Sequence, residues 1–462
     1  MATAWDKHST KGLAKLQDTL VREQVRHVLA PFSPYWKQRL AELGKPAMSM
    51  SSAKAVATLP AAGERDVSPH GDPAGMAALV VQATESGFAL HAHGPTLRRA
   101  LRLRATKRDA YRRLVDHDTK PTAYAWTGLG FRYPVASTRG DLDVIARAGA
   151  RLWKVLGLSS DDALLSALPA AATTEHTALH YAALATGTPA LFPGGALADV
   201  AAAARLAAPT VIAVAAANAP AVIDAITAGG GSLERLRTLL LVGAPSAAER
   251  AAALAAVDAT RVAVLAVHAP AGARVMWGEC REAGADGGLH TYPDLDLVQL
   301  VDAETGEPAD AGPAEVVLTQ LGLRGSALLR WRTGDLATGG IDATRCPGCK
   351  RRVPRVVGVR RRALVLVSAD GRSLDLRALA GALAGRSELS DWRVVLGARK
   401  RDGRAQVVVH FATNGDPGEA AVATAADVRA VAGILPTQMV DAQGALAGVV
   451  GEPLTRRILQ RS

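Results

Sequence analysis

Residues 178–214 read ALHYAALATGTPALFPGGALADVAAAARLAAPTVIAV. Two helical patterns alternate in this stretch with the short apolar runs PALFP and PTVIAV. The alternation continues through another helical pattern to the strand-like run LRTLLLVGAP, which ends at Pro245. Short apolar runs between helices are typical of parallel strands joined by right-handed crossovers. We therefore predict an α/β fold with largely parallel sheets.

The pattern changes after Leu289. Residues 295–321 contain two strand-like runs around the turn-rich ETGEPADAG, which predicts a β-rich subdomain. Towards the C-terminus, the strand-like ALVLV, WRVVLGA and AQVVVHF accompany one helical pattern. A chain of 462 residues is too long for one simple core. We expect a large N-terminal domain at 1–357, with the parallel sheets and the β-rich subdomain, and a small α+β domain at 358–462.

Composition and charge restrict the class of protein. The hydrophobic fraction of 49% and the charged fraction of 21% are those of an ordinary folded chain. The polar start and the absence of an apolar run of about 20 residues favour the cytoplasm and no membrane partner.

The net charge of +11 would suit an anionic partner, and basic residues gather at 96–114. We interpret that stretch as a solvated amphipathic helix with an apolar stripe that includes Leu101. A nucleic-acid site is less favoured, because Tyr111 is its only aromatic residue.

The cysteines have the spacing of a metal site. Cys346 and Cys349 form a CPGC knuckle, and Cys280 lies ten residues before His290. Three sulfurs and one imidazole would make a closed, structural zinc site, with no open position for catalysis. The alternative is a glycine turn with free thiols and an unrelated histidine.

The order of these segments resembles that of the adenylate-forming, AMP-binding ligases, and phenylacetate-CoA ligases in particular. The resemblance covers nearly the whole chain and includes SPYWKQRLAELG (33–44), residues 178–214, LLLVGAP (239–245) and LLRWRTGDLA (328–337). It implies a ligase that activates an aryl or acyl carboxylic acid as an acyl-adenylate, using ATP with Mg, and passes it to CoA or to the thiol of a carrier protein.

The resemblance also implies positions for the ligands. The turn after the 239–242 run would lie along adenine, and RWRTGD would bind ribose, which gives the nucleotide-binding set Gly243, Ala244, Pro245, Arg332, Thr333 and Asp335. Asp335 has an alternative reading as an ordinary turn aspartate after Gly334. His180 and Tyr181 would line the acyl pocket.

The groups expected to act on phosphate are depleted. The phosphate loop should fall in AWTGLGFRYP (125–134), which has few hydroxyls, and the magnesium-binding glutamate should fall in VHAPAGARVMWGEC (267–280), which has no carboxylate before Glu279. The C-terminal lysine is missing from GEPLTRRIL. Arg132, Glu279 and Arg456 are the catalytic candidates by position. The alternative is a degenerate member that binds a nucleotide, an acyl group or a protein partner without turnover.

Overall fold

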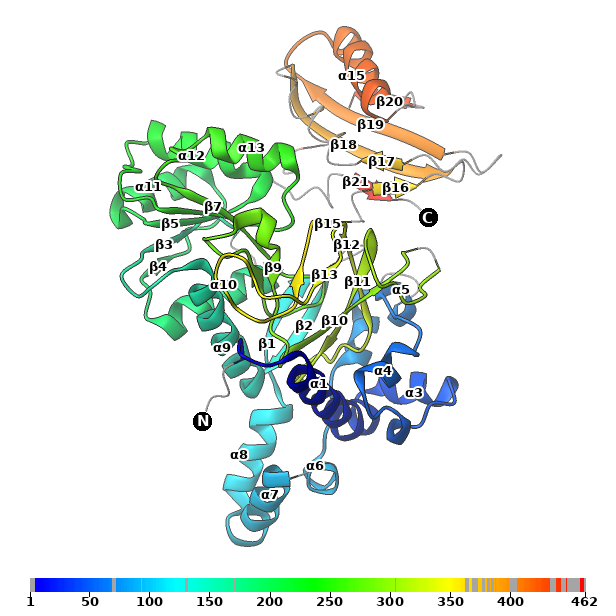
Figure 1. Cartoon of the computed structure of the whole chain (residues 1–462). Coiled ribbons are helices and arrows are strands. Elements are labelled where there is room, and N and C mark those ends of the chain that lie inside the picture. Colours follow the sequence, from blue (N-terminus) through cyan, green and yellow to red (C-terminus); the bar gives the residue numbers. More distant parts are fainter. Residues whose placement is uncertain are drawn as a thin grey trace. The chain divides into compact units, whose positions relative to one another are not determined.

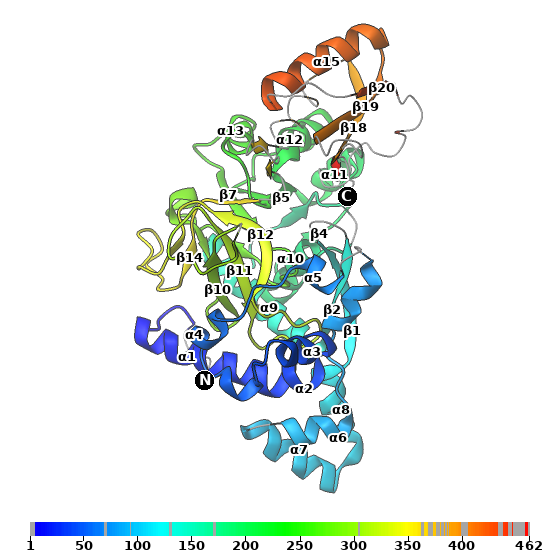
Figure 2. The same ribbon diagram turned by 90° about the vertical axis from the view of Figure 1, so that its right-hand side faces the viewer.

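Two units make up the chain in the computed structural model, Met1–Arg360 and Arg361–Ser462 (Figures 1 and 2). In the first unit the structure describes residues 5–68, 72–92, 94–128, 132–169, 172–303 and 305–360. In the second it describes residue 361 and residues 365–367, 373–375, 379, 383, 386, 388–398, 405–432, 438–441, 446 and 458–460. Each unit is described by itself.

A nine-stranded sheet runs through the first unit. Its strand order is β13 (Ile341–Asp342), β14 (Arg355–Val356), β9 (Leu289–His290), β8 (Trp277–Gly278), β7 (Ala263–His268), β6 (Thr238–Val242), β5 (Val211–Ala215), β3 (Leu164–Ser166) and β4 (Ala190–Leu191). The strands from β4 to β7 are parallel, whereas β8, β9, β14 and β13 add antiparallel pairs. The predicted α/β fold with a parallel sheet is confirmed.

The helices that connect the parallel strands are α10 (Thr174–Thr186), α11 (Leu197–Ala207), α12 (Ala219–Ala228) and α13 (Ala247–Ala255), with a short 3-10 turn η4 (Ala216–Asn218), and α9 (Arg139–Leu156) precedes the first of these strands, β3. Thr138 caps α9 by accepting from the Asp141 N–H, and the Asp141 carboxylate accepts from the Thr138 N–H. Inside α9, a Cβ at Gly149 would lie 2.5 Å from the Ala182 Cα of α10. The glycine therefore lets these two helices pack backbone to backbone.

The β-rich part is a four-stranded sheet in the order β10 (Asp296–Val301), β11 (Ala314–Gln320), β12 (Trp331–Ala337) and β15 (Val359–Arg361). A hairpin of β1 (Pro121–Thr127) and β2 (Tyr133–Thr138) precedes α9 in the chain, and the short turn η5 (Gly284–Gly287) precedes β9. The N-terminal segment contributes α1 (Thr10–Gln24), η1 (Val25–Leu29), α2 (Ala30–Phe32), α3 (Pro34–Glu42), η2 (Ala47–Ser49), α4 (Ala53–Ala57), α5 (Glu64–Val67) and η3 (Pro73–Leu79). Trp36 and Trp331 join these helices and the sheet in one buried cluster, and the Trp36 indole donates to the Ala327 carbonyl.

Three helices form a small lobe at one end of the first unit: α6 (Glu85–His91), α7 (Gly94–Thr106) and α8 (Arg108–Thr119) (Figures 1 and 2). The lobe has a buried cluster of its own, which includes Phe88, Ala100, Tyr111 and Val115. The basic stretch 96–114, interpreted from sequence as one amphipathic helix, thus folds as two helices that separate at Lys107.

In the second unit, β20 (Gln438–Asp441), β19 (Ala405–Thr413), β18 (Leu389–Ala398) and β21 (Ile458–Gln460) form a sheet, with the helix α15 (Pro417–Ala432). A separate pair consists of β16 (Val365–Val367) and β17 (Ser373–Asp375). Arg456 lies outside the described residues. Among those that are described, no helix combines the length and the apolar character needed to cross a bilayer.

Candidate functional site

The turn that follows β6 leaves open space beside its backbone. Gly243 has a φ of +116°, a conformation that favours glycine, and its N–H donates to the Val267 carbonyl of β7 at 2.8 Å. A Cβ at this position would have no other atom within 4 Å. Ala244 is buried, and Pro245 is half-buried. Ligands of open α/β sheets bind outside the carboxyl ends of parallel strands, which is where this turn lies.

A buried histidine links this strand end to the expected ribose-binding residue. His268 is the last residue of β7, and its Nε2 lies 2.8 Å from Oδ2 of Asp335 in β12. Each side chain is only 1% exposed. The structure therefore brings the Gly243 turn and Asp335 to neighbouring positions, joined through Val267 and His268. Sequence reasoning missed His268, although its place directly after an apolar strand pointed to the same edge of the sheet.

Asp335 lies inside a strand and not in a turn. Its N–H donates to the Thr333 hydroxyl at 3.2 Å, and that hydroxyl donates to the Val316 carbonyl at 2.8 Å. The alternative reading of Asp335 as a turn aspartate is therefore wrong. Arg332 does not join Asp335, because successive side chains of a strand point to opposite faces. The Arg332 guanidinium pairs instead with Glu315, at 2.5 Å.

Glu279 lies in a buried ion pair. It is 5% exposed, one of its carboxylate oxygens lies 2.6 Å from Nη2 of Arg250, and the other accepts from the Ala266 N–H at 2.8 Å. Burial raises the pKa of the Glu279 carboxyl, and the Arg250 charge opposes that rise. Both carboxylate oxygens thus have protein partners, an arrangement typical of a structural group.

The phosphate-loop candidate belongs to the β1–β2 hairpin. The Arg132 guanidinium lies 5.3 Å from the centre of the Trp126 ring, a distance at which a cation is attracted to an aromatic face. Thr127, one of the few hydroxyls left in this loop, accepts from the Gly272 N–H at 2.9 Å. The hairpin is therefore tied to Gly272 in the 267–280 segment, where the resemblance had led us to expect the magnesium-binding carboxylate.

The two acyl-pocket candidates lie on α10 and have different surroundings. His180 is exposed, and its ring centre lies 5.3 Å from that of Phe192, which also packs against His176 at 4.9 Å. Tyr181 is partly buried against the large core cluster under the sheet. Burial lowers the pKa of His176, and the neighbouring His180 lowers it further.

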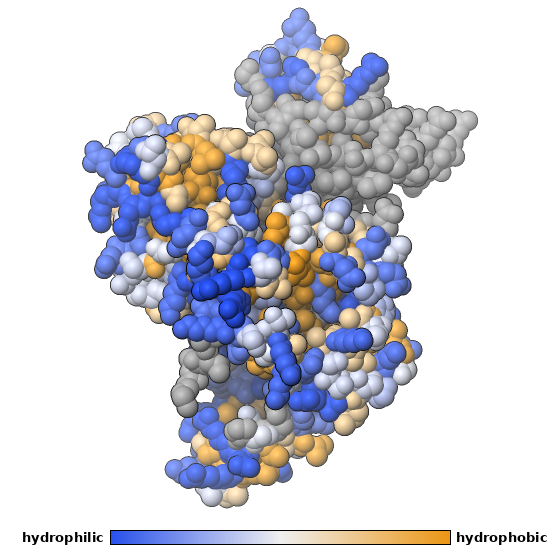
Figure 3. Space-filling model, viewed as in Figure 1, coloured by the Kyte–Doolittle hydropathy of each residue, from blue (hydrophilic) through white to orange (hydrophobic). Residues whose placement is uncertain are grey.

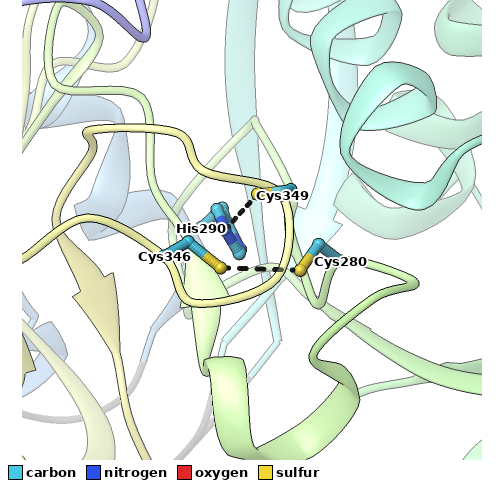
Figure 4. Close-up of side chains that lie close together, drawn as sticks. All are labelled: Cys280, His290, Cys346 and Cys349. Carbon is cyan, nitrogen blue, oxygen red and sulfur yellow. Dashed lines mark hydrogen bonds between the residues drawn. The ribbon is translucent and has the colours of Figure 1, made fainter.

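The four predicted metal ligands meet in one place, at the ends of β8 and β9 and in the CPGC knuckle (Figure 4). The ligand atoms of Cys280, His290, Cys346 and Cys349 all lie within 4.8 Å of one another. The Sγ atoms of Cys280 and Cys346 are 3.7 Å apart, too far for a disulfide and close to the separation of about 3.8 Å between two sulfurs on a tetrahedral zinc ion.

The surroundings of these ligands fit a metal ion. The Gly278 carbonyl lies 3.2 Å from Nδ1 of His290, so an Nδ1–H can donate to it and leave Nε2 with its lone pair towards the sulfurs. Burial raises the pKa of the Cys280 thiol to about 12. Burial also acts on Cys349, but a hydrogen bond with His290 brings its pKa below the ordinary value. Gly348 fits the turn because a Cβ there would lie 2.8 Å from the Ala283 backbone nitrogen.

Comparisons with known proteins find similarity in structure only. No protein-family model and no curated protein sequence matches the chain. The structure is similar to 2-hydroxyisobutyryl-CoA ligase in complex with 2-HIB-AMP and CoA, with a TM-score of 0.64 at 14% identity, covering 99% of this chain and 91% of the ligase. It is also similar to that ligase in the postadenylation state with R3-HIB-AMP, with a TM-score of 0.66 at 14% identity, covering 98% of this chain and 89% of the ligase.

Proposed function

Because the chain has the fold of the adenylate-forming ligases, we propose that it is an AMP-forming carboxylate ligase. It would activate an aryl or acyl carboxylic acid as an acyl-adenylate and pass the acyl group to CoA or to the thiol of a carrier protein. The observation that supports this proposal is that His268, at the carboxyl end of β7 and beside the open turn at Gly243, contacts the Asp335 carboxylate, so the residues that we assign to the base and to the ribose are linked through β7.

In this proposal the residues mainly bind and orient the nucleotide. The flat base would lie along the backbone of Gly243, Ala244 and Pro245, beside the open space at Gly243. The Asp335 carboxylate would accept from ribose hydroxyls, and His268 would hold it in the required orientation. Arg132, in the loop between β1 and β2, would supply positive charge for the phosphates. His180 and Tyr181 would contact the acid.

Magnesium, which this fold implies, does not fit the one carboxylate that the sequence offers for it. Glu279 is buried and held by Arg250 and the Ala266 N–H. Magnesium prefers oxygen ligands that leave room for several waters. Glu279 therefore offers no free oxygen with which to hold a magnesium ion.

A zinc ion does fit its residues, and we propose that Cys280, His290, Cys346 and Cys349 hold one. The four ligands would complete a tetrahedral shell and leave no position for water or substrate, so the ion would stabilise the fold and not take part in the reaction.

A second candidate function is binding of a nucleotide or acyl group without turnover. The Glu279–Arg250 ion pair favours this second function, because the carboxylate that the sequence offered for magnesium is held in a structural contact. The loss of loop hydroxyls points the same way. The loss of one transition-state donor costs about 100- to 1,000-fold in rate, so several losses together would leave little activity.

Carboxylate-dependent pyrophosphate exchange separates the two candidates. The native chain is assayed with a panel of aryl and fatty acids, and AMP binding is titrated by calorimetry in parallel. Exchange with any acid supports the ligase, whereas AMP binding without exchange supports the second candidate.

Asp335→Ala should weaken AMP binding at least about tenfold, and Asp258→Ala, which removes an exposed carboxylate elsewhere, should leave it unchanged. If Asp335→Ala binds AMP as well as the native chain does, the nucleotide is misplaced in both candidates.

A further inference from the structure

One stretch of the small helical lobe, residues 94–114, is strongly basic, whereas the rest of the lobe holds the acids Glu85, Asp116 and Asp118. Residues 94–114 contain eight cations and one acid, Asp109, so this stretch holds seven of the chain's eleven excess positive charges. All eight cations are exposed, namely Arg98, Arg99, Arg102, Arg104, Lys107, Arg108, Arg112 and Arg113. Among the described residues, only Arg112 of this set lies within 4 Å of a carboxylate, that of Glu85 at 3.9 Å. The charge is therefore not used to hold the lobe together.

The lobe folds around its own apolar residues and leaves other apolar side chains in solvent. Tyr111 is 2% exposed, and its hydroxyl donates to the Glu85 carbonyl. By contrast, Leu101 of α7 is 50% exposed and Leu90 of α6 is 78% exposed. On the face of the lobe that is visible in Figure 3, hydrophobic and hydrophilic residues lie side by side. Leu101, which the sequence places in an apolar stripe, stays outside the core of the lobe, and Ala100 and Leu103 pack into that core instead.

Helical geometry places cations and an apolar group together on the outward face of α7. Arg98, Leu101 and Arg102 are three and four residues apart, so they lie on one side of the helix. Ala100 and Leu103, which pack into the lobe, lie on the other side. A face of this kind, basic with an exposed leucine between two arginines, is typical of helices that lie on a membrane surface.

We propose that this lobe is a docking surface for an anionic phospholipid membrane. Phosphate headgroups would pair with the arginines, and the apolar region just below them would accept Leu101 and Leu90. A nucleic acid would satisfy the arginines but not the leucines, and the phenylalanine and tyrosine of the lobe, Phe88 and Tyr111, are buried and so not placed to stack on a base. A peripheral contact of this kind needs no spanning helix. It revises the expectation of no membrane partner and does not depend on the ligase activity.

Vesicle sedimentation tests the proposal with the full chain. Vesicles of equimolar phosphatidylglycerol and phosphatidylcholine should bind the protein, and vesicles of phosphatidylcholine alone should not. High salt should release it, because screening weakens exposed charges. The double variant Arg98→Glu and Arg102→Glu should lose at least about tenfold in apparent affinity, since each basic residue near an anionic surface contributes about fivefold. Leu101→Ser should lose affinity without changing the salt dependence.

A charge-matched control uses exposed arginines outside the lobe. Arg147→Glu with Arg235→Glu changes the net charge by the same amount and should bind vesicles as the native chain does. The proposal is overturned if this control loses as much affinity as the lobe variant, or if the lobe variant, folded by circular dichroism, binds like the native chain. Binding of duplex DNA without binding of the anionic vesicles would also overturn it and would assign the lobe to nucleic acid.

Discussion

Asp296→Asn should stabilise the protein at neutral pH, because the native carboxyl is buried at a cost. Asp296 is 1% exposed, and the Trp277 indole donates to its Oδ2 at 2.8 Å. Burial raises its pKa from 3.8 to about 7; the Trp277 hydrogen bond opposes the rise, and the nearby Asp294 adds to it. The carboxyl therefore prefers to be protonated in the folded chain and ionised in the unfolded one.

The sign and size of the effect follow from these two pKa values. Below pH 3.8 both states are protonated, and the residue does not influence stability. From there to about pH 7, each pH unit favours the unfolded state by about 1.4 kcal/mol, and above about pH 7 the cost is constant. A shift of about three units corresponds to a cost on the order of 4 kcal/mol at pH 8. Asparagine can still accept from the Trp277 indole and avoids this cost.

Thermal unfolding at several pH values between 5 and 8 measures the difference. The melting temperature of Asp296→Asn should exceed that of the native chain by an amount that grows as the pH rises, by several degrees at pH 8. Asp294→Asn is the matched control and should lower the melting temperature. Asp294 forms an ion pair with Arg151 through both carboxylate oxygens, at 2.7 and 2.8 Å, and the substitution would remove it. A stabilisation that is the same at every pH, or a loss of stability at pH 8, would refute the reasoning.

Three further predictions concern other parts of the first unit. The purified protein should contain about one zinc per chain by elemental analysis, and Cys346→Ser should release it and lower the melting temperature. Arg250→Met should cost about 3–5 kcal/mol in denaturant unfolding, because it leaves the Glu279 carboxylate buried without its cation, and adding Glu279→Gln should recover most of the loss. The hydrogen bond that His117 donates to the Asp118 carboxylate raises the pKa of His117 above 6.5, so His117→Gln should destabilise most below pH 6.5 and progressively less as the pH rises through the folded-state pKa. A pH-independent loss would contradict the assignment for His117.

The sequence contained enough local information for the fold. The apolar runs that became β5 and β6 lie between helices whose periodicity is readable over a few turns, and a parallel arrangement follows from such connections. The two-residue spacing of Cys346 and Cys349 likewise placed both in one knuckle. Local spacing also argues against grouping Arg332 with Asp335 in one site. The two residues are three positions apart in a strand, so their side chains point to opposite faces of the sheet.

The remainder depended on contacts between distant residues. His268 and Asp335 are 67 positions apart, and nothing near either residue indicates that the histidine fixes the carboxylate. The same holds for Arg250 and Glu279, 29 positions apart, whose pairing turns a catalytic candidate into a buried structural group. No proline or glycine marks the break at Lys107 between α7 and α8. The break depends on tertiary packing, since Ala100 of α7 and Tyr111 of α8 share one buried cluster.

The cysteine cluster joins two segments that are far apart in the chain. Cys280 and Cys346 are 66 residues apart, and β10, β11 and β12 all lie between them. An ion bound to both would close that segment into a loop and restrict the denatured chain as well as the folded one. For a covalent link of this span the lost chain entropy amounts to about 4 kcal/mol. Much of the ion's influence would therefore fall on the denatured ensemble, and chelation should slow the refolding of the sheet that the loop encloses.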